Sequence, residues 1–403
     1  MYQGKNIKEQ SKIFIKLLFP VLIYQIISYS SSMIGTFMAG HYSPTDLAGV
    51  SMGVNIWNPV MYTLNSIVLA IVPIVSQLMG KGREQEIPTK VRQFLYIAVF
   101  ISIILIIGLN TLAEPIVNGL GMDENIARVT KKYLFYESIG VLPIFLYVVL
   151  RAFMDSLGLT RLSMIMMVIS IPVNVLLAYG FIFGKLGMPE LGGAGNGMAV
   201  SLTYTVLFFI ALFLTLKHPK INKYKIFEKE GIKFTHWLEI FKLGVPIAIA
   251  TALETVVFST LSLMVSRFDT TIIASHQAAL NFSGFLYSLP VSVANTVTII
   301  VAYHVGAKNY KMARRYTILG VIMGMIFAFL AGLIVWIFDA NIPYLYSKDL
   351  DVISLTGHLL LYAIGFAICD SFASALAGVL RGYKKVVPIC VAMFIGYYLV
   401  GIP

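Results

Sequence analysis

The sequence predicts an all-α polytopic membrane protein made of two six-helix lobes that are related by a parallel repeat. Hydrophobic residues make up 58% of its 403 positions and charged residues 12%, with a mean hydropathy of +0.83. Soluble domains of this length do not have such a composition. The apolar residues form long runs separated by short basic loops, and landmarks of the first half recur in the second at a constant spacing. These three observations indicate the fold class.

Eleven apolar runs are long enough to cross a hydrocarbon core of about 30 Å. In chain order they fall at 14–38, 48–79, 93–113, 133–154, 162–184, 195–216, 239–265, 272–305, 315–338, 353–380 and 386–403. The longest must tilt or project beyond the lipid. The N-terminus is polar and basic and the first run can span, so we expect no cleavable signal peptide.

The basic residues predict the orientation of these helices. With the N-terminus in the cytoplasm, 24 of the 30 Lys and Arg residues fall on the cytoplasmic side and 6 on the other side. This is the asymmetry that cytoplasmic loops show in multi-pass proteins. The net charge of +11 therefore marks cytoplasmic loops, and we expect a lipid bilayer and no nucleic acid as the surroundings of this chain.

The repeat predicts the domain organisation. Under a shift of 226 residues Pro20 falls on Pro246, and further matches continue without a gap over two helices. Six helices are an even number, so both lobes have the same orientation in the membrane. We expect an N-terminal lobe at 1–216, a cytoplasmic linker at 217–238 that is a solvated charged loop, and a C-terminal lobe at 239–403.

The same repeat predicts twelve helices, of which eleven are present in this chain. The sixth helix should have a partner near 421–442, whereas the sequence ends at Pro403 within an apolar run. We therefore expect the chain to be truncated before a twelfth helix.

Two carboxylates lie deep in the apolar runs of the second lobe. Glu254 is about twelve residues from Lys242, or about 18 Å along a helix, and Asp370 is about 16 Å from Arg381. Both are therefore expected near the midplane and at similar depth. A carboxylate at this depth is costly and marks a functional site by default. We expect Glu254 and Asp370 to bind a cation or a proton, and we expect no basic residue deep inside any helix to pair with them.

The other polar residues of the helices have less specific interpretations. Asn174, Asn281 and Gln277 are candidates for cavity lining or interhelical hydrogen bonding, and the second role is the more common one. Glu137 follows two Lys residues closely, so we expect it near the outer membrane interface with a surface or capping role. Asp155 flanks a cytoplasmic turn and is expected to be structural.

Pro20 and Pro246 are hinge candidates. They occupy equivalent places early in the first helix of each lobe. A proline inside a helix removes one backbone hydrogen bond and permits a kink.

The sequence does not contain the residue patterns of an enzyme. The six His residues lie in loops or near helix ends, and Cys369 and Cys390 are too few for a disulfide framework or a Cys/His metal site. We therefore expect a protein that is not an enzyme and that needs no cofactor other than a coupling ion. A membrane-embedded enzyme stays the alternative of a different class.

Several longer segments carry a family resemblance. In the first half they are FMAGHYSPTDLAGVSMG, VPIVSQLMGKG, LRAFMDSLGLTR and IPVNVLLAYGFIFGKLGMPELGGAGNGMAVSLTY. In the second half they are KLGVPIAIATALETVVFS, SHQAALNFSGFLYSLPVSV and LAGVLRGYKK. With these segments the chain resembles the multidrug and toxic compound extrusion (MATE) transporters of the bacterial NorM-like type, over essentially its whole length.

The resemblance implies a twelve-helix, two-lobed antiporter in the bacterial inner membrane. Such proteins export small cationic, lipophilic compounds in exchange for Na⁺ or H⁺, and we expect a monomer. By position, Glu254 and Asp370 match the family's acids on helices seven and ten, which are implicated in cation coupling. A Na⁺ site at these two residues is one form of that coupling. The alternative function is a lipid-linked sugar flippase of the same superfamily.

Two positions depart from the family pattern. The family often has Asp-Thr before Met-Ala-Gly on its first helix, whereas Gly35 stands at the acidic position here. Four residues before Asp370, some NorM-like members have Tyr, and this chain has Phe366. The first change argues against coupling through an acid of the N-terminal lobe, and the second removes a hydroxyl ligand for Na⁺.

Overall fold

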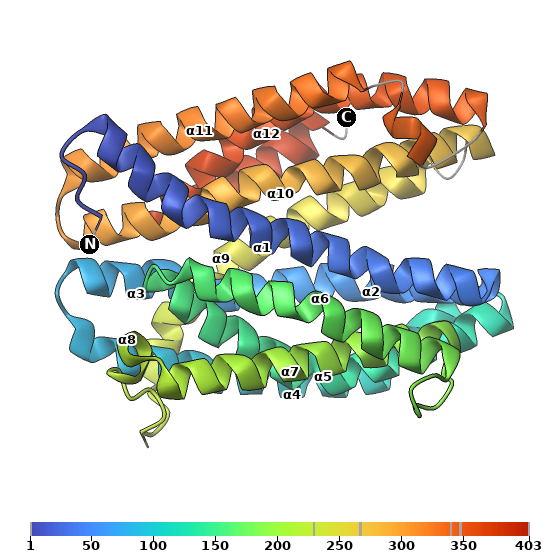
Figure 1. The fold of residues 1–403 in the computed structure, drawn as a ribbon, viewed down its shortest axis with the longest axis horizontal. Coiled ribbons are helices and arrows are strands. Elements are labelled where there is room, and N and C mark those ends of the chain that lie inside the picture. The colour runs from blue at the N-terminus through green and yellow to red at the C-terminus, as the bar shows by residue number, and fades with distance from the viewer. Residues whose placement is uncertain (1, 229, 266–267, 339–340, 346–348, 402–403) are drawn as a thin grey trace. The chain divides into compact units, whose positions relative to one another are not determined.

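The computed structural model describes residues 2–228, 230–265, 268–338, 341–345 and 349–401, and these ranges are helical with short connections (Figure 1). Ten helices in them are long and apolar enough to cross a membrane, and a shorter apolar helical segment follows at Val387–Gly401. This confirms the prediction of an all-α, multi-pass protein. The run expected at 386–403 ends in two residues outside the described ranges.

The long helices in chain order are α1 (Ile7–Tyr42), α2 (Pro44–Leu69), α3 (Ile71–Gly80), α4 (Ile87–Gly119), α5 (Glu124–Ser156), α6 (Thr160–Phe183), α7 (Gly195–Lys217), α9 (Phe234–Val265), α10 (Thr270–Gly306), α11 (Tyr310–Ile337) and α12 (Leu350–Gly382). The short elements are η1 (Glu84–Glu86), η2 (Gly192–Ala194), α8 (Pro219–Asn222), η3 (Ile342–Leu345), α13 (Val387–Phe394) and the π-helical η4 (Ile395–Gly401).

Polar residues define several helix ends. The Ser43 hydroxyl accepts hydrogen bonds from the backbone amides of Thr45 and Asp46, and Pro44 is the first residue of α2. Such a side chain satisfies amides that have no partner within the helix. Gly184 ends α6 with a φ of 64°, a left-handed conformation that glycine adopts without strain.

The chain forms two compact units. Unit 1 consists of Met1–Ile26, Met79–Gly82 and Ala250–Pro403, and unit 2 consists of Ile27–Leu78 and Arg83–Ile249. The helices α1 and α9 each contribute to both units. The boundaries of the compact units lie within α1 and α9 and around 79–82, whereas the repeat predicts lobes at 1–216 and 239–403.

Unit 2 is arranged around α5, which packs against α2, α4 and α7. Glycines permit the close approach of these helices. A Cβ atom at Gly53 of α2 would lie 2.4 Å from the Tyr133 ring, and one at Gly140 would lie 2.5 Å from the Ser201 hydroxyl on α7. Small residues at helix contacts are the usual packing device of membrane helices.

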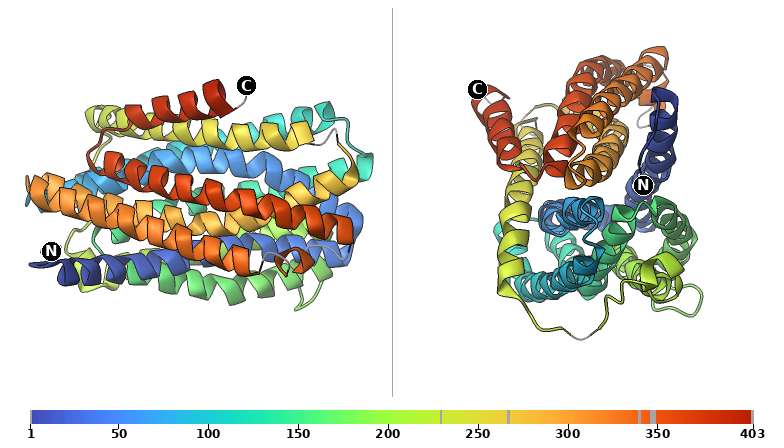
Figure 2. Two further views of the ribbon diagram at one scale, coloured as in Figure 1. Left: turned by 90° about the horizontal axis from the view of Figure 1, so that it is seen from above. Right: turned by 90° about the vertical axis from the view of Figure 1, so that its left-hand side faces the viewer.

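Unit 1 is arranged around α10, which packs against α11 and α12. The Thr298 hydroxyl donates to the Gly378 carbonyl at 3.0 Å, and a Cβ atom at Gly378 would lie 2.4 Å from the Ala294 carbonyl oxygen. The start of α1 lies beside α11 in this unit, and Figure 2 shows the same placement from two further sides. Phe14 of α1 approaches Gly320 of α11 there.

The two hinge candidates lie inside helices. Pro20 is buried within α1, and Pro246 is half-buried within α9. Their role as hinges stays a prediction.

Candidate functional site

Glu254 lies on α9 in unit 1 and is half-buried among small and apolar residues. The hydroxyl of Tyr287 on α10 donates a hydrogen bond to its Oε1 atom at 3.2 Å. The Tyr287 residue is 37% exposed. Sequence reasoning did not select Tyr287, because its approach to Glu254 depends on how α10 is rotated against α9.

Asp370 lies on α12 in the same unit and is also half-buried. The charges of Asp370 and Glu254 act on each other, and Ser374, one turn further along α12, hydrogen-bonds the Asp370 carboxylate. The structure thus brings the two predicted acids into one site. Two neighbouring carboxylates repel each other unless a proton or a cation is shared between them.

The expectation that no basic residue lies deep inside a helix to pair with the two acids concerned helix interiors, and one basic residue acts on the site from a helix end. Arg381 lies in the last turn of α12, and its charge acts on both Glu254 and Tyr287. The cause is the direction of helical side chains, which point back toward the N-terminus of their helix. A long guanidinium side chain at the end of α12 can therefore act on Glu254 and Tyr287. Its Nε atom is buried and has no hydrogen-bond partner in the part of the chain that the structure describes.

Aromatic rings surround this group of residues. Phe258, one turn after Glu254, contacts Phe366 edge to face at 6.1 Å between ring centroids and Tyr397 at 6.4 Å. The charges of both acids also act on Tyr397. Phe366 is 43% exposed. Aromatic faces of this kind attract organic cations.

Asn174, Asn281 and Gln277, the candidates for cavity lining or interhelical hydrogen bonding, differ in burial and in the helix that they bond. The amide nitrogen of Asn174, which is buried in unit 2, donates to the Thr203 hydroxyl at 3.4 Å between α6 and α7. Asn281 and Gln277 lie one turn apart on the exposed face of α10, and the Asn281 amide donates to the Gln277 carbonyl at 3.0 Å. The contact of Asn174 is an interhelical bond of the expected kind.

Two carboxylates of unit 2 are buried. The structural role expected for Asp155 agrees with its 2.9 Å ion pair to Arg151 and its 2.6 Å hydrogen bond from Ser163. The surface role expected for Glu137 is wrong, because this side chain is only 1% exposed. The reason is its place on α5, which is packed by other helices on several sides.

Gly35 packs directly against a polar side chain of unit 2. A Cβ atom at this position would lie 1.7 Å from the Oδ1 atom of Asn196. The Asn196 amide thus fills the space in which an aspartate side chain at position 35 would begin. An acid there would require Asn196 to move.

The linker is bonded to α4 at several points, while most of its described residues are exposed, as in the solvated loop that the sequence predicts. The Glu230 carboxylate pairs with Arg92 at 2.8 Å, and the Tyr96 hydroxyl donates to the Glu230 carbonyl at 2.6 Å. The Gln93 amide donates to the Gly231 carbonyl and accepts from the Lys233 backbone amide, both at 3.0 Å. A hydrogen bond from Lys233, together with the charge of Arg92, lowers the pKa of Glu230.

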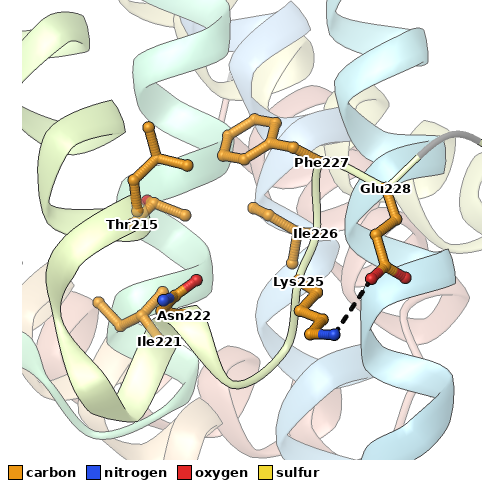
Figure 3. A pocket seen from close by; sticks show the side chains of 8 residues that line it. Thr215, Ile221, Asn222, Lys225, Ile226, Phe227 and Glu228 are labelled. Carbon is orange, nitrogen blue, oxygen red and sulfur yellow. Dashed lines mark ion pairs between the residues drawn. The ribbon is translucent and has the colours of Figure 1, made fainter.

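Earlier in the linker, burial raises the pKa of Tyr224 to about 12, and its hydroxyl donates to Glu84 at 2.9 Å. A pocket of about 230 Å³ lies between the end of α7 and this part of the linker (Figure 3). An ion pair of 3.5 Å between Lys225 and Glu228 borders it. Half of the lining residues are apolar and half are polar, and the titratable ones are the paired Lys225 and Glu228.

Within the described residues, no group of three or more His, Cys, Asp or Glu side chains could hold a metal ion. The thiols of Cys369 and Cys390 are free. A Na⁺ ion at the predicted site would therefore have two carboxylates, Glu254 and Asp370, as its charged ligands.

A family model described as MatE matches this chain twice, over residues 20–180 and 246–403. The chain belongs to the MatE family. The two matches begin at Pro20 and Pro246, which is the 226-residue shift seen in the sequence. The repeat predicted from the sequence thus coincides with the two family matches of this MatE protein.

Curated relatives match over the full chain and carry the name "Probable multidrug resistance protein NorM". The relative from Oceanobacillus iheyensis is 39% identical, with 100% of this chain and 90% of the relative covered. Those from Streptococcus pneumoniae and Bacillus subtilis are each 40% identical, with 100% of this chain and 89% of the relative covered.

Solved structures of MATE transporters share the fold of this MatE protein. The crystal structure of the eukaryotic transporter AtDTX14 has a TM-score of 0.88 at 20% identity and covers 98% of this chain and 87% of its own. An outward-facing multidrug resistance MATE family transporter has a TM-score of 0.85 at 14% identity, with 96% and 86% covered.

Proposed function

We propose that this MatE protein is a secondary active antiporter that exports cationic, lipophilic compounds in exchange for Na⁺ or H⁺ by alternating access. It works as a monomer in the bacterial cell membrane, with its N-terminus in the cytoplasm and no cofactor besides the coupling ion. The names of its curated relatives support export of drugs, and they favour it over transport of a lipid-linked sugar.

The group formed by Glu254, Asp370 and Arg381 carries this proposal. Two ionised carboxylates and one guanidinium leave one net negative charge, because an arginine is always protonated in proteins. One proton or one Na⁺ ion makes the group neutral. A net charge is costly inside a membrane. The neutral group with its ion bound therefore favours an apolar environment, and the charged group without the ion favours contact with water. If the two transport conformations differ in how far this group is exposed to water, they bind the ion with different affinity. Ion binding then shifts the equilibrium between the two conformations by that difference.

The aromatic residues beside the acids support the substrate class. Phe258, Phe366 and Tyr397 supply rings next to two carboxylates. A lipophilic cation can contact the rings with its apolar body and the acids with its charge. Because the same acids attract the coupling ion, substrate and ion compete, and exchange follows from that competition.

The test is ethidium efflux from proteoliposomes under a Na⁺ gradient alone and then under a pH gradient alone. We expect wild-type efflux under one of the two gradients and a decrease of about tenfold or more in Glu254→Gln and Asp370→Asn, since each variant removes a charge from the group. The matched control is Glu124→Gln, because that exposed acid begins α5. Wild-type rates in both site variants, or no efflux under either gradient, would contradict the proposal.

A further inference from the structure

A second buried carboxylate lies outside the group formed by Glu254 and Asp370. Glu137 is near the middle of α5, in a span that runs from Glu124 to Ser156. Its side chain is 1% exposed in unit 2. Nothing in the proposed exchange at Glu254 and Asp370 makes use of this residue. A carboxylic acid in such a place needs its own explanation, since ionisable groups inside membranes are costly.

The polar contacts of Glu137 leave one of its oxygens bare. Its Oε1 atom lies 2.8 Å from the hydroxyl of Tyr133, one turn earlier on α5. Its Oε2 atom is buried and has no hydrogen-bond partner among the described residues. Tyr133 is the one described side chain whose hydrogen bond acts on this carboxyl. A bare, ionised oxygen that is shielded from water is far less stable than a protonated acid.

No described charge on the neighbouring helices compensates for Glu137. On α4, Glu114 pairs with Lys131 of α5 and is exposed. On α2, the titratable neighbour is Tyr62, whose charge acts on Tyr133 and not on the carboxyl itself. On α7, Ser201 donates to the backbone carbonyl of Glu137 at 3.3 Å. The proton is therefore the cation that fits this site.

The packing around Tyr133 shows how small the site is. A Cβ atom at Gly53 of α2 would lie 2.4 Å from the Tyr133 ring, and one at Gly197 of α7 would lie 2.7 Å from its backbone carbonyl. The ring thus fills the junction of α2, α5 and α7 and closes the carboxyl off. Tyr62 of α2 is 53% exposed, and its charge acts on Tyr133.

We propose that Glu137 is a proton-binding site of unit 2. The acid holds its proton while Tyr133 closes the junction of the three helices. The Tyr133 hydroxyl then donates to Oε1, which is the neutral carbonyl oxygen, and the proton lies on Oε2. Movement of the Tyr133 ring admits water from the side of Tyr62, the O–H bond of the acid breaks, and the proton passes to that water. In the proposed antiporter this is a second proton, separate from the ion bound at Glu254 and Asp370.

The test is infrared spectroscopy of the full chain in liposomes at neutral pH, which detects the carbonyl band of a protonated carboxylic acid. The spectra are recorded in a Glu254→Gln/Asp370→Asn background, so the result does not depend on the coupling proposed for those two acids. We expect that Glu137→Gln removes an acid band, that the exposed-acid control Glu124→Gln retains it, and that Tyr133→Phe shifts it. The last variant keeps the carboxyl and the ring, so it tests the assignment even if Glu137→Gln fails to fold.

Exchange with deuterated buffer separates a proton-binding site from a permanently neutral acid. We expect the Glu137 band to shift in deuterated buffer, because water reaches the acid when Tyr133 moves. Three results would overturn the proposal. They are the absence of an acid band that depends on Glu137, a band unchanged by Tyr133→Phe, and a band that never shifts in deuterated buffer.

Discussion

At the scale of single residues, the hydroxyl of Tyr287 stands out because it bonds the Glu254 carboxylate from a neighbouring helix. Some NorM-like proteins place a tyrosine four residues before the helix-ten acid, and this chain has Phe366 there. The hydroxyl of Tyr287 therefore supplies, from α10, an oxygen that α12 lacks at that position. Removing the Tyr287 hydroxyl should therefore weaken ion binding near Glu254.

Tyr287→Phe tests this hydroxyl. It removes a hydrogen bond to a charged group and leaves the ring, so the coupling ion loses an oxygen near Glu254. We expect the ion concentration for half-maximal efflux to rise about tenfold, which corresponds to the loss of one bond of this type. Phe366→Tyr, which adds a hydroxyl close by, is the comparison variant. An unchanged ion dependence in Tyr287→Phe would show that the hydroxyl does not contribute to ion binding.

Arg381→Gln tests the cation at the end of α12. The substitution leaves Glu254 and Asp370 without a compensating positive charge. We expect a loss of folding stability of about 1 kcal/mol, because the charge of Arg381 favours the ionised form of Glu254. The measurement is thermal unfolding in detergent.

A double-mutant cycle provides the control for Arg381. In Glu254→Gln/Arg381→Gln one carboxylate and the guanidinium are both neutralised, so the loss should be smaller than the sum of the single losses by about 1 kcal/mol or more. Additive losses would mean that Arg381 and Glu254 do not interact.

At the scale of elements, the linker is held on α4 by side chains from several consecutive turns. Gln93 binds the linker backbone on both sides of Ile232, and its Oε1 atom also accepts from the Trp237 indole at 3.0 Å. Arg92 and Tyr96 bind Glu230. These bonds order the chain directly before α9 begins, so they fix where that helix starts within unit 2.

Acid should weaken this attachment. The pKa of Glu230 is lower in the folded protein, chiefly through its hydrogen bond from Lys233. Its ionised form therefore stabilises the fold above the ordinary Glu pKa of 4.5, and that contribution is lost as the pH falls through the lowered value. We expect faster hydrogen exchange at the Lys233 amide at about pH 4 than at pH 7, after correction for the intrinsic rate.

The matched variants for the linker are Glu230→Gln and Glu228→Gln. The first should remove the pH dependence, because it deletes the titrating carboxylate that Arg92 and Lys233 bind. The second changes an exposed acid in the same segment and should retain the pH dependence. Equal protection at both pH values in the unmodified protein would contradict the prediction.

At the scale of the whole molecule, apolar runs and the repeat predict most of the helices. The run at 93–113 lies within α4, which is longer because its polar ends continue the helical hydrogen bonds. The run at 48–79 is two helices, α2 and α3, which are separated at Ala70. Hydropathy marks the apolar part of a helix, whereas its ends and breaks depend on caps and backbone geometry.

The sequence predicted the candidate site only in part. The depth of Glu254 and Asp370 could be estimated from helical rise, and the structure places both in unit 1. Tyr287, Arg381 and the burial of Glu137 depend on which face of a helix meets its neighbour. Helical rise along the chain does not contain that information, because it gives the position along the axis and not the rotation about it.

The division of α1 and α9 between the units has a consequence for fragments of this chain. A cut in the linker near residue 229 would produce two polypeptides that each lack a helix half needed by their own unit. The N-terminal fragment would retain Tyr2, whose carbonyl binds His304 at 2.9 Å in unit 1. The C-terminal fragment would retain His236, whose ring contacts Lys90 at 2.6 Å in unit 2. A protease-nicked protein would therefore remain joined by reciprocal helix exchange, in the manner of a domain-swapped pair.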